Sequence, residues 1–411
     1  MFMHRRIIQN ITICFTCWLL LLSFSGCSQT RDELRSKSVK VFKRNIEYSE
    51  GKPIKAIFQP TIVSTSDGTV HLFAQGRLYN SHDHTDKVLL YKSSGDHGDT
   101  WSDTRFLTPP GSFWGIASYV VVDSLTASEQ LHVIFVYSRV KLFELYSERE
   151  LKTLFNIAKA DYSEEQTSIL YKLSSSDNGN TWERGILKED FMSKYDKHGR
   201  YISFFTPVGQ INRVSNGPHR GRILAGGAVK YADRPIPDPR DIYDYKQTSS
   251  SFIYSDDNGE SWQLGGIAPY GGNEASVAEI HGDSLIMIRR RNKDNEVPKR
   301  ILNRSFDGGA SWQENEFTED LPSPRCLGIL YEDEGVFLYT TPAKKQRLKA
   351  WIAYSHDKGD TWQHKVLKRG FFSYSDIERI KGTDYYMVAF ARVHHGELGL
   401  STIRIHRDWL Y

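Results

Sequence analysis

The sequence predicts an all-β fold, and two observations carry this prediction. A motif of the form Ser-x-Asp-x-Gly-x-Thr/Ser-Trp occurs five times, and five of the nine tryptophans end a copy. A strand-like run precedes each copy, so a strand, a tight turn and a second strand recur along the chain. The copies cover residues 94–101, 175–182, 255–262, 305–312 and 355–362. Repetition of this kind indicates an architecture built from repeated β units.

Each position of the motif has a physical role in a hairpin turn. The Asp side chain accepts hydrogen bonds from nearby backbone amides, as in an Asx turn. The Gly takes a positive φ without steric penalty. The hydroxyl residue ties the returning strand, and the Trp packs its apolar face beneath the turn. We therefore expect the five Asp residues to be structural and not ligands of a metal ion.

One segment departs from the β pattern. Residues 141–159 carry apolar side chains near helical spacing. This spacing predicts a short helical insertion between two β units.

The charge balance excludes some classes of partner. The 411-residue chain has 53 Lys plus Arg against 50 Asp plus Glu, so no basic excess marks a nucleic-acid-binding protein. Apolar residues at 39% and charged residues at 25% describe an ordinary globular chain. The sequence has no Cys-based zinc pattern, phosphate-binding glycine loop or dinucleotide motif. We therefore expect no nucleic-acid partner, no metal site and no cofactor.

Residues 1–27 resemble a bacterial lipoprotein signal peptide. Two early arginines precede an apolar run, Ile11 to Phe24, that is shorter than a comfortable membrane span. The run ends in Phe-Ser-Gly-Cys, which resembles a lipobox in which Cys27 would be lipidated. An uncleaved anchor, or an ordinary signal with an incidental Cys, is the alternative. The expected product is an exported, membrane-anchored lipoprotein on the periplasmic side or at the outer-membrane surface.

The expected domain organisation follows from this leader. Residues 28–44 would form a tether and residues 45–411 the folded domain. Loss of the leader leaves Cys326 as the one thiol besides Cys27, so no internal disulfide is possible. Cys326 lies in an apolar stretch, and we expect a buried structural thiol there.

The five motifs resemble Asp boxes, and the chain resembles the sialidase superfamily of β-propellers. This resemblance implies a six-bladed β-propeller of sialidase type, with the boxes at the outer corners of the blades. Roughly 370 residues in six four-stranded blades would give about 60 per blade, a reasonable size. Asp boxes also occur on unrelated folds, so the boxes alone do not imply an activity.

The resemblance covers nearly the whole mature chain and implies a catalytic pair. Sialidases use a Tyr activated by a Glu, an exception among glycosidases, because the substrate's own carboxylate would repel a carboxylate nucleophile. The run Gly-Asn-Glu-Ala-Ser at 272–276 matches the segment that holds the base, which assigns this role to Glu274. The run Phe-Ser-Tyr-Ser-Asp at 372–376 matches the segment that holds the nucleophile, which assigns this role to Tyr374.

The general acid and base of the family is an Asp that follows an Arg by six residues. Arg77 and Asp83 have this spacing, which assigns the acid to Asp83 and a substrate-binding role to Arg77. Asp86 and His82 are nearby rivals of Asp83.

Three arginines hold the substrate carboxylate in the family. Arg290 matches the second of them, although its two arginine neighbours leave the register open by one, and Arg347 matches the third. Phe58 occupies the position of the first. The strand 385–390 also lacks the Glu that pairs with this arginine in the family, so both partners of one ion pair are missing together.

These matches predict an exo-acting glycoside hydrolase of the sialidase type. It would remove terminal sialic acid or a related acidic sugar from glycans. A non-catalytic glycan-binding propeller lipoprotein at the cell surface is the alternative, and Phe58 supports it. A propeller lyase or arabinan-type hydrolase, and a scaffold that binds proteins, also stay open. The expected partners are sialylated or related glycans and the membrane lipid, and the expected state is a monomer.

Overall fold

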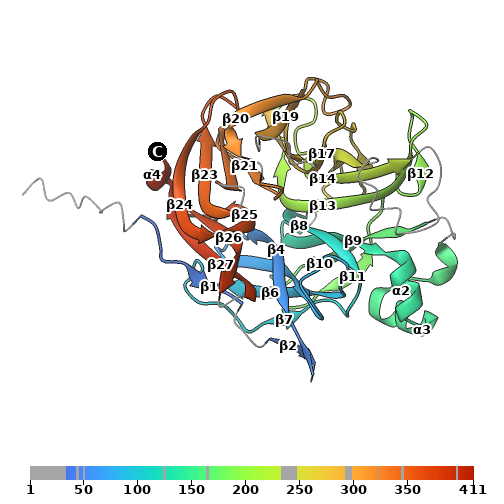
Figure 1. Cartoon of the computed structure of the whole chain (residues 1–411). Helices are drawn as coiled ribbons and strands as arrows, with labels where there is room; N and C mark the ends of the chain where they lie inside the picture. Colours follow the sequence, from blue (N-terminus) through green and yellow to red (C-terminus); the bar gives the residue numbers. More distant parts are fainter. Residues whose placement is uncertain are drawn as a thin grey trace, which may run out of the picture.

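The computed structural model shows sheets that surround a common centre (Figure 1). It describes residues 34–42, 46–49, 51–123, 126–162, 166–232, 248–291, 299–322, 324–343, 347–394 and 397–411. Cys27 and the rest of the predicted signal peptide lie outside these residues. In the ranges given, no helix is long and apolar enough to cross a membrane.

The described strands pair into six antiparallel sets that follow one another along the chain. Set 1 is β4 (Ala56–Ser64), β5 (Val70–Arg77), β6 (Lys87–Ser94) and β7 (Arg105–Phe106). Set 2 is β8 (Phe113–Val122), β9 (Glu129–Ser138), β10 (Ser168–Ser175) and β11 (Glu183–Ile186). Set 3 is β13 (Tyr201–Arg213), β14 (Ile223–Ala232), β15 (Thr248–Ser255) and β16 (Gln263–Leu264).

The second half of the chain repeats this pattern. Set 4 is β17 (Gly272–His281), β18 (Ser284–Arg291), β19 (Lys299–Ser305) and β20 (Glu316–Pro322). Set 5 is β21 (Ile329–Asp333), β22 (Val336–Pro342), β23 (Leu348–Ser355) and β24 (Gln363–Phe371). Set 6 is β25 (Ser373–Arg379), β26 (Tyr385–His394), β27 (Glu397–His406) and, from the other end of the chain, β1 (Val39–Lys40).

The first strands of the six sets form a closed ring. Each first strand contacts that of the next set, from β4 through β8, β13, β17 and β21 to β25, and β25 contacts β4 again. Parallel pairing of β8 with β13 and of β27 with β4 strengthens two of these boundaries. A ring of sheets around an axis is the propeller architecture, so the all-β propeller prediction is confirmed. The six predicted blades would each be one of these sets.

The N-terminal described residues pack on set 6. β1 pairs with β27, and Val41 and Phe42 beside it are buried. Part of the predicted 28–44 tether, residues 34–42, is therefore held against the domain, because its apolar side chains are covered there. Two further short strand pairs join β2 (Glu47–Ser49) to β3 (Lys52–Pro53) and β12 (Lys194–Tyr195) to β13.

The predicted helical insertion is present, but its predicted place between two β units is wrong: it lies within set 2, between the paired strands β9 and β10. It contains α2 (Arg139–Leu145), α3 (Glu148–Glu150), the π-helical turn η1 (Leu151–Phe155) and the 3-10 turn η2 (Lys159–Asp161). Ser147 and Glu150 form a capping box at the start of α3. Leu151 and Phe155 are buried in a core cluster that sets 1 and 2 share, which fixes the insertion to the propeller. A last short helix, α4 (Arg407–Leu410), ends the chain.

The Asp boxes form the turns between the third and fourth strands of sets 1 to 5. In the second box, Asp177 accepts hydrogen bonds from the Thr181 backbone N–H at 2.8 Å and from the Thr181 hydroxyl at 2.6 Å. These hydrogen bonds lower the pKa of Asp177 to about 2, so the carboxylate stays ionised and satisfied within its own turn. The structural role expected for the box carboxylates follows from this geometry.

The box tryptophans do more than support their own turns. The Trp182 ring lies 5.5 Å from that of Tyr91 in the preceding set, and the Trp262 ring lies 5.6 Å from that of Tyr119. Each of these tryptophans therefore packs on the set before it and seals the boundary between two sets.

Candidate active site

Tyr374, Glu274 and Arg290 meet near the centre of the ring. The Tyr374 hydroxyl lies 3.1 Å and 3.3 Å from the two Glu274 carboxylate oxygens and can donate to them. Arg290 Nη1 donates to Glu274 at 2.7 Å and to the Tyr374 oxygen at 3.0 Å. The contact predicted between Tyr374 and Glu274 is present in the structure.

The strands explain why these side chains meet. Glu274 lies near the start of β17, Arg290 lies near the end of the antiparallel neighbour β18, and Tyr374 starts the innermost strand of set 6. Side chains alternate along a strand, so Arg289 points to the other face, where it is buried and donates to Asn303 at 2.6 Å. The arginine beside the proposed base is therefore Arg290, which resolves the register.

Arg347 borders the same tyrosine. Its guanidinium lies 5.7 Å from the Tyr374 ring centroid, and its Nη1 donates to the Ser373 hydroxyl at 2.9 Å. A second N–H donates to the Arg325 carbonyl at 2.7 Å, which fixes the side chain from its other side. Cys326, next in the chain, is fully buried as expected. Arg347 and Arg290 thus place two cations around the Tyr374 phenol.

A chain of side-chain contacts connects Asp83 to Tyr374 through Arg77 and Phe58. Arg77 Nη2 binds the Asp83 carboxylate at 2.6 Å, and the Arg77 guanidinium stacks 4.6 Å from the Phe58 ring centroid. The Phe58 ring lies edge-on to Tyr374 at 6.0 Å. The Asp83 side chain is 72% exposed, whereas that of Arg77 is 7% exposed, so a bound ligand can reach the carboxylate.

Lys87 is a residue of this region that the sequence did not reveal. Its side chain is fully buried, lies 5.1 Å from the Trp114 ring and donates to the Asp83 carbonyl at 2.6 Å and the Thr85 carbonyl at 3.2 Å. It therefore holds the backbone of the loop that carries Asp83. Burial lowers the pKa of Lys87 to about 7, and the nearby Arg77 adds to this shift. No motif marks such a lysine, because its role comes from its burial behind the loop.

The local electrostatics keep Tyr374 protonated at rest. Burial raises the pKa of its phenol, the Glu274 carboxylate raises it further, and Arg290 opposes this shift. The phenol therefore needs a base to accept its proton before it can attack an electrophile. Glu274 is the carboxylate in position to do so.

Two residues beside the centre have a backbone conformation that side chains other than glycine rarely adopt. Arg347 has a φ of 56° and Gln59 a φ of 45°. The strand β4 is irregular between Phe58 and Thr61, which directs Phe58 toward Arg77 and Tyr374. The positive φ of Arg347 and of Gln59 is a form of backbone strain, of order 1–3 kcal/mol per residue, that concentrates at functional sites. Gln59 is a second residue of this region that the sequence motifs did not indicate.

The structure thus brings all six predicted residues into one connected group. Among the described residues, no three His, Cys, Asp or Glu side chains are grouped so that they could hold a metal ion. A carboxylate–phenol pair with two adjacent guanidinium groups can bind an anion and transfer a proton from the phenol.

Comparisons with known proteins identify the family of the chain. A family model described as the BNR repeat-like domain matches residues 146–387. A sialidase of Micromonospora viridifaciens is 23% identical over 345 residues, which cover 79% of this chain and 48% of the relative. This chain therefore spans about half the length of that relative. A sialidase of Paraclostridium sordellii is 24% identical over 73% of this chain and 67% of its own length.

Solved structures show the same fold. A Hadza microbial sialidase superposes with a TM-score of 0.62 at 19% identity, over 87% of this chain and 66% of that chain. The Trypanosoma rangeli sialidase in complex with the inhibitor DANA superposes with a TM-score of 0.61 at 19% identity, over 90% of this chain and 59% of that chain. At these identities the likeness establishes a β-propeller of sialidase type.

Proposed function

The chain belongs to the BNR repeat-like domain family within the sialidase superfamily, and we propose that it is an exo-acting glycoside hydrolase of the sialidase type. Its substrate would be a glycan with a terminal sialic acid or a related acidic sugar. The observation that carries the proposal is the Tyr374 hydroxyl at 3.1 Å from Glu274, with Arg290 bonded to both side chains.

In the proposed reaction, Arg290 and Arg347 hold the sugar carboxylate. This places the anomeric carbon against the Tyr374 oxygen, which attacks it as Glu274 takes the phenol proton. Asp83 gives a proton to the departing glycosidic oxygen, so the aglycone leaves as an alcohol. The sugar is then bonded to the tyrosine.

The second half reverses these proton transfers. Asp83 takes a proton from a water molecule, whose oxygen attacks the anomeric carbon. The bond to Tyr374 breaks, and the phenolate recovers its proton from Glu274. The net reaction consumes one water and releases the free sugar, and every group returns to its starting state.

Phe58 bears on the preferred substrate. One charge-assisted contact fewer to the carboxylate should weaken binding by roughly 1.5–3 kcal/mol, or about 10- to 150-fold. We therefore expect weak action on ordinary sialosides, or better action on a sugar whose own group fits beside Phe58. The same residue is the observation that favours the second candidate function, a glycan-binding propeller without catalysis.

Sugar release separates the two functions. Purified protein without residues 1–27 should release sugar from some member of a panel of sialylated and neutral oligosaccharides. Tyr374→Phe should slow this release by about a hundredfold or more, because the nucleophile and its proton are lost. Tyr354→Phe, at a tyrosine far along β23, is the matched control and should leave the rate unchanged. Glycan binding without release by the wild type would support the binding function and reject the hydrolase.

We also propose that the protein is an exported lipoprotein, anchored through Cys27 to the periplasmic or outer surface and present as a monomer. The lipobox-like run before Cys27 is the support. Cys27→Ser should abolish lipidation and move the protein out of the detergent phase on partitioning. An unchanged mass and partition would reject the anchor.

A further inference from the structure

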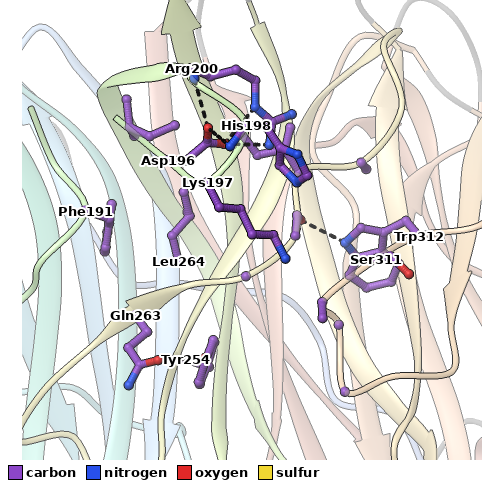
Figure 2. A pocket seen from close by; sticks show the side chains of 18 of the residues that line it. Phe191, Asp196, Lys197, His198, Arg200, Tyr254, Gln263, Leu264, Ser311 and Trp312 are labelled. Atoms are coloured by element: carbon purple, nitrogen blue, oxygen red, sulfur yellow. Dashed lines mark hydrogen bonds and ion pairs between the residues drawn. The ribbon is translucent and has the colours of Figure 1, made fainter. Parts of the chain in front are cut away.

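A cavity of about 850 Å³ lies apart from Tyr374, beside sets 3 and 4. Figure 2 shows it between the turn 196–200, β16 and the Asp box that ends at Trp312. We call it the outer groove and define it by Lys197, His198, Tyr254, Tyr270 and Trp312, all of which line it. Its volume lies in the range of small-ligand sites, roughly 300–1,000 Å³.

Aromatic rings line the outer groove, and two of them, Tyr254 and Trp312, are held in place by contacts within the protein. The Arg222 guanidinium packs 4.1 Å from the Tyr254 ring centroid. The Trp312 indole N–H donates to the Gly266 carbonyl at 2.8 Å, and the Trp312 ring lies edge-on to Phe252 at 5.8 Å. Tyr270 also lines the groove, and it is 53% exposed, so part of this residue is accessible to a ligand. Rings that are already fixed lose little conformational entropy on binding.

A rigid turn places polar groups opposite these rings. Asp196 accepts hydrogen bonds from the backbone N–H groups of His198 and Arg200, both at 2.9 Å, and from Arg200 Nε at 2.7 Å. The turn projects Lys197 into the cavity between Leu264 and Trp312 (Figure 2). Lys197 and His198 can therefore bond a ligand that lies on the aromatic wall.

The charges of the lining nearly cancel. Arg200 is paired with Asp196 at 2.6 Å, Arg222 is paired with Asp256 at 2.7 Å, and Asp307 is bonded within its own box. Lys197 and Asp190 remain, one charge of each sign, with no ion pair to either among the described residues. A phosphate or nucleotide would need more uncompensated cations. An apolar ligand would leave these polar groups unpaired.

We propose that the outer groove is a second, non-catalytic carbohydrate site that binds a neutral oligosaccharide. The C–H face of a sugar ring packs on a fixed aromatic ring, and its hydroxyl groups can both donate to Asp190 and accept from Lys197 and His198. The groove would hold the enzyme on a glycan while the centre acts on a chain end. Choosing the neutral interior of sialylated glycans as its ligand rests on the proposed function.

Calorimetric titration with an asialo tri-N-acetyllactosamine tests the proposal, because this probe carries no sialic acid for the central site. The wild type should bind the probe, and Tyr270→Ala and Lys197→Ala should each weaken binding about three- to tenfold. Phe317→Ala is the control for Tyr270→Ala, since Phe317 is 50% exposed and lies outside the groove lining. Lys52→Ala is the corresponding control for Lys197→Ala. Both controls should bind as the wild type does.

Absence of binding by folded wild type overturns the proposal, and so does binding that neither groove substitution weakens. Circular dichroism of each variant identifies a folding defect, and a conservative Tyr270→Leu then replaces Tyr270→Ala. Hydrolysis of an aryl sialoside, assayed in the same variants, should be unchanged because this substrate is too small to reach the groove. Hydrolysis without probe binding rejects the outer groove alone, whereas probe binding without sugar release from any member of the oligosaccharide panel rejects the proposed hydrolase alone.

Discussion

At the residue scale, Lys87 shows how a buried side chain outside the proposed chemistry can control the group that performs it. Its ammonium bonds two carbonyls of the Asp83 loop, with Arg77, Asp83 and Asp86 as its charged neighbours. The pKa of Lys87 is lowered to about 7, so the lysine is charged below pH 7 and neutral above it. Its charge-assisted hydrogen bonds weaken as pH rises through this value.

We predict that Lys87→Met lowers kcat about tenfold with little change in KM, because the Asp83 loop loses its fixed position. The wild type should lose activity as pH rises above about 7. The variant should not show this loss, because the methionine at position 87 does not titrate. Rates of aryl sialoside hydrolysis between pH 5 and 9 would measure both effects. Lys92→Met is the matched control. Lys92 is also on β6 and also donates to a backbone carbonyl, that of Ser102, but it does not contact the Asp83 loop. An unchanged pH profile in Lys87→Met would show that the lysine has only a packing role.

At the element scale, the Asp boxes connect neighbouring sets as well as closing their own turns. Trp262 is 1% exposed, its indole N–H donates to Gly259 in the same box at 3.2 Å, and its ring packs on Tyr119 of the preceding set. The turn was predictable, because all its partners lie within eight residues. The packing on Tyr119 was not, since that residue lies far back in the sequence and meets Trp262 only after the ring of sheets has closed.

We therefore expect Trp262→Ala to lower the free energy of unfolding by about 3–5 kcal/mol, the range for removal of a large buried aromatic side chain. Trp101→Ala should have a smaller effect, because Trp101 ends its box in a partly buried position. Urea denaturation followed by fluorescence would measure the difference between the two variants. A loss in Trp262→Ala no larger than that in Trp101→Ala would contradict the greater contribution assigned to the buried tryptophan.

At the scale of the whole molecule, the centre of the propeller contains acids that the proposed reaction does not use. Burial raises the pKa of Asp376 to about 7 and that of Glu378 to about 8. Glu378 accepts a hydrogen bond from Gln210 at 3.0 Å. The folded protein retains a proton on Glu378 between pH 4.5 and 8, where the unfolded chain has lost it, so stability falls as pH rises through this window.

Glu378→Gln should remove part of this pH dependence. The free energy of unfolding of the variant minus that of the wild type should be larger at pH 8.5 than at pH 5, by at least about 1 kcal/mol. Urea denaturation at the two pH values would measure the gain. Glu183→Gln, at an exposed site on β11, is the control and should show no such difference. The same difference in unfolding free energy between Glu378→Gln and the wild type at both pH values would contradict the claim that burial raises the pKa of Glu378.

The two kinds of site differ in how far the sequence could predict them. Tyr374, Glu274 and Arg290 lie in local segments that resemble a known family, and the alternation of side chains in β18 then selects Arg290 over Arg289. Gln59, Lys87 and the outer groove have no local signature. They depend on a strand irregularity, on burial, and on two sets that come together only in the folded ring.

The central claim, that Tyr374 is the nucleophile, is tested most directly by trapping the sugar on it. A Trypanosoma rangeli sialidase structure is described as a covalent intermediate with 2,3-difluorosialic acid, so this compound is a suitable probe. After incubation and trypsin digestion, mass spectrometry should find one sugar on the peptide 370–379, whose single tyrosine is Tyr374. Tyr374→Phe should carry none. A wild type that hydrolyses sialosides while the sugar is found on another peptide would contradict the assignment.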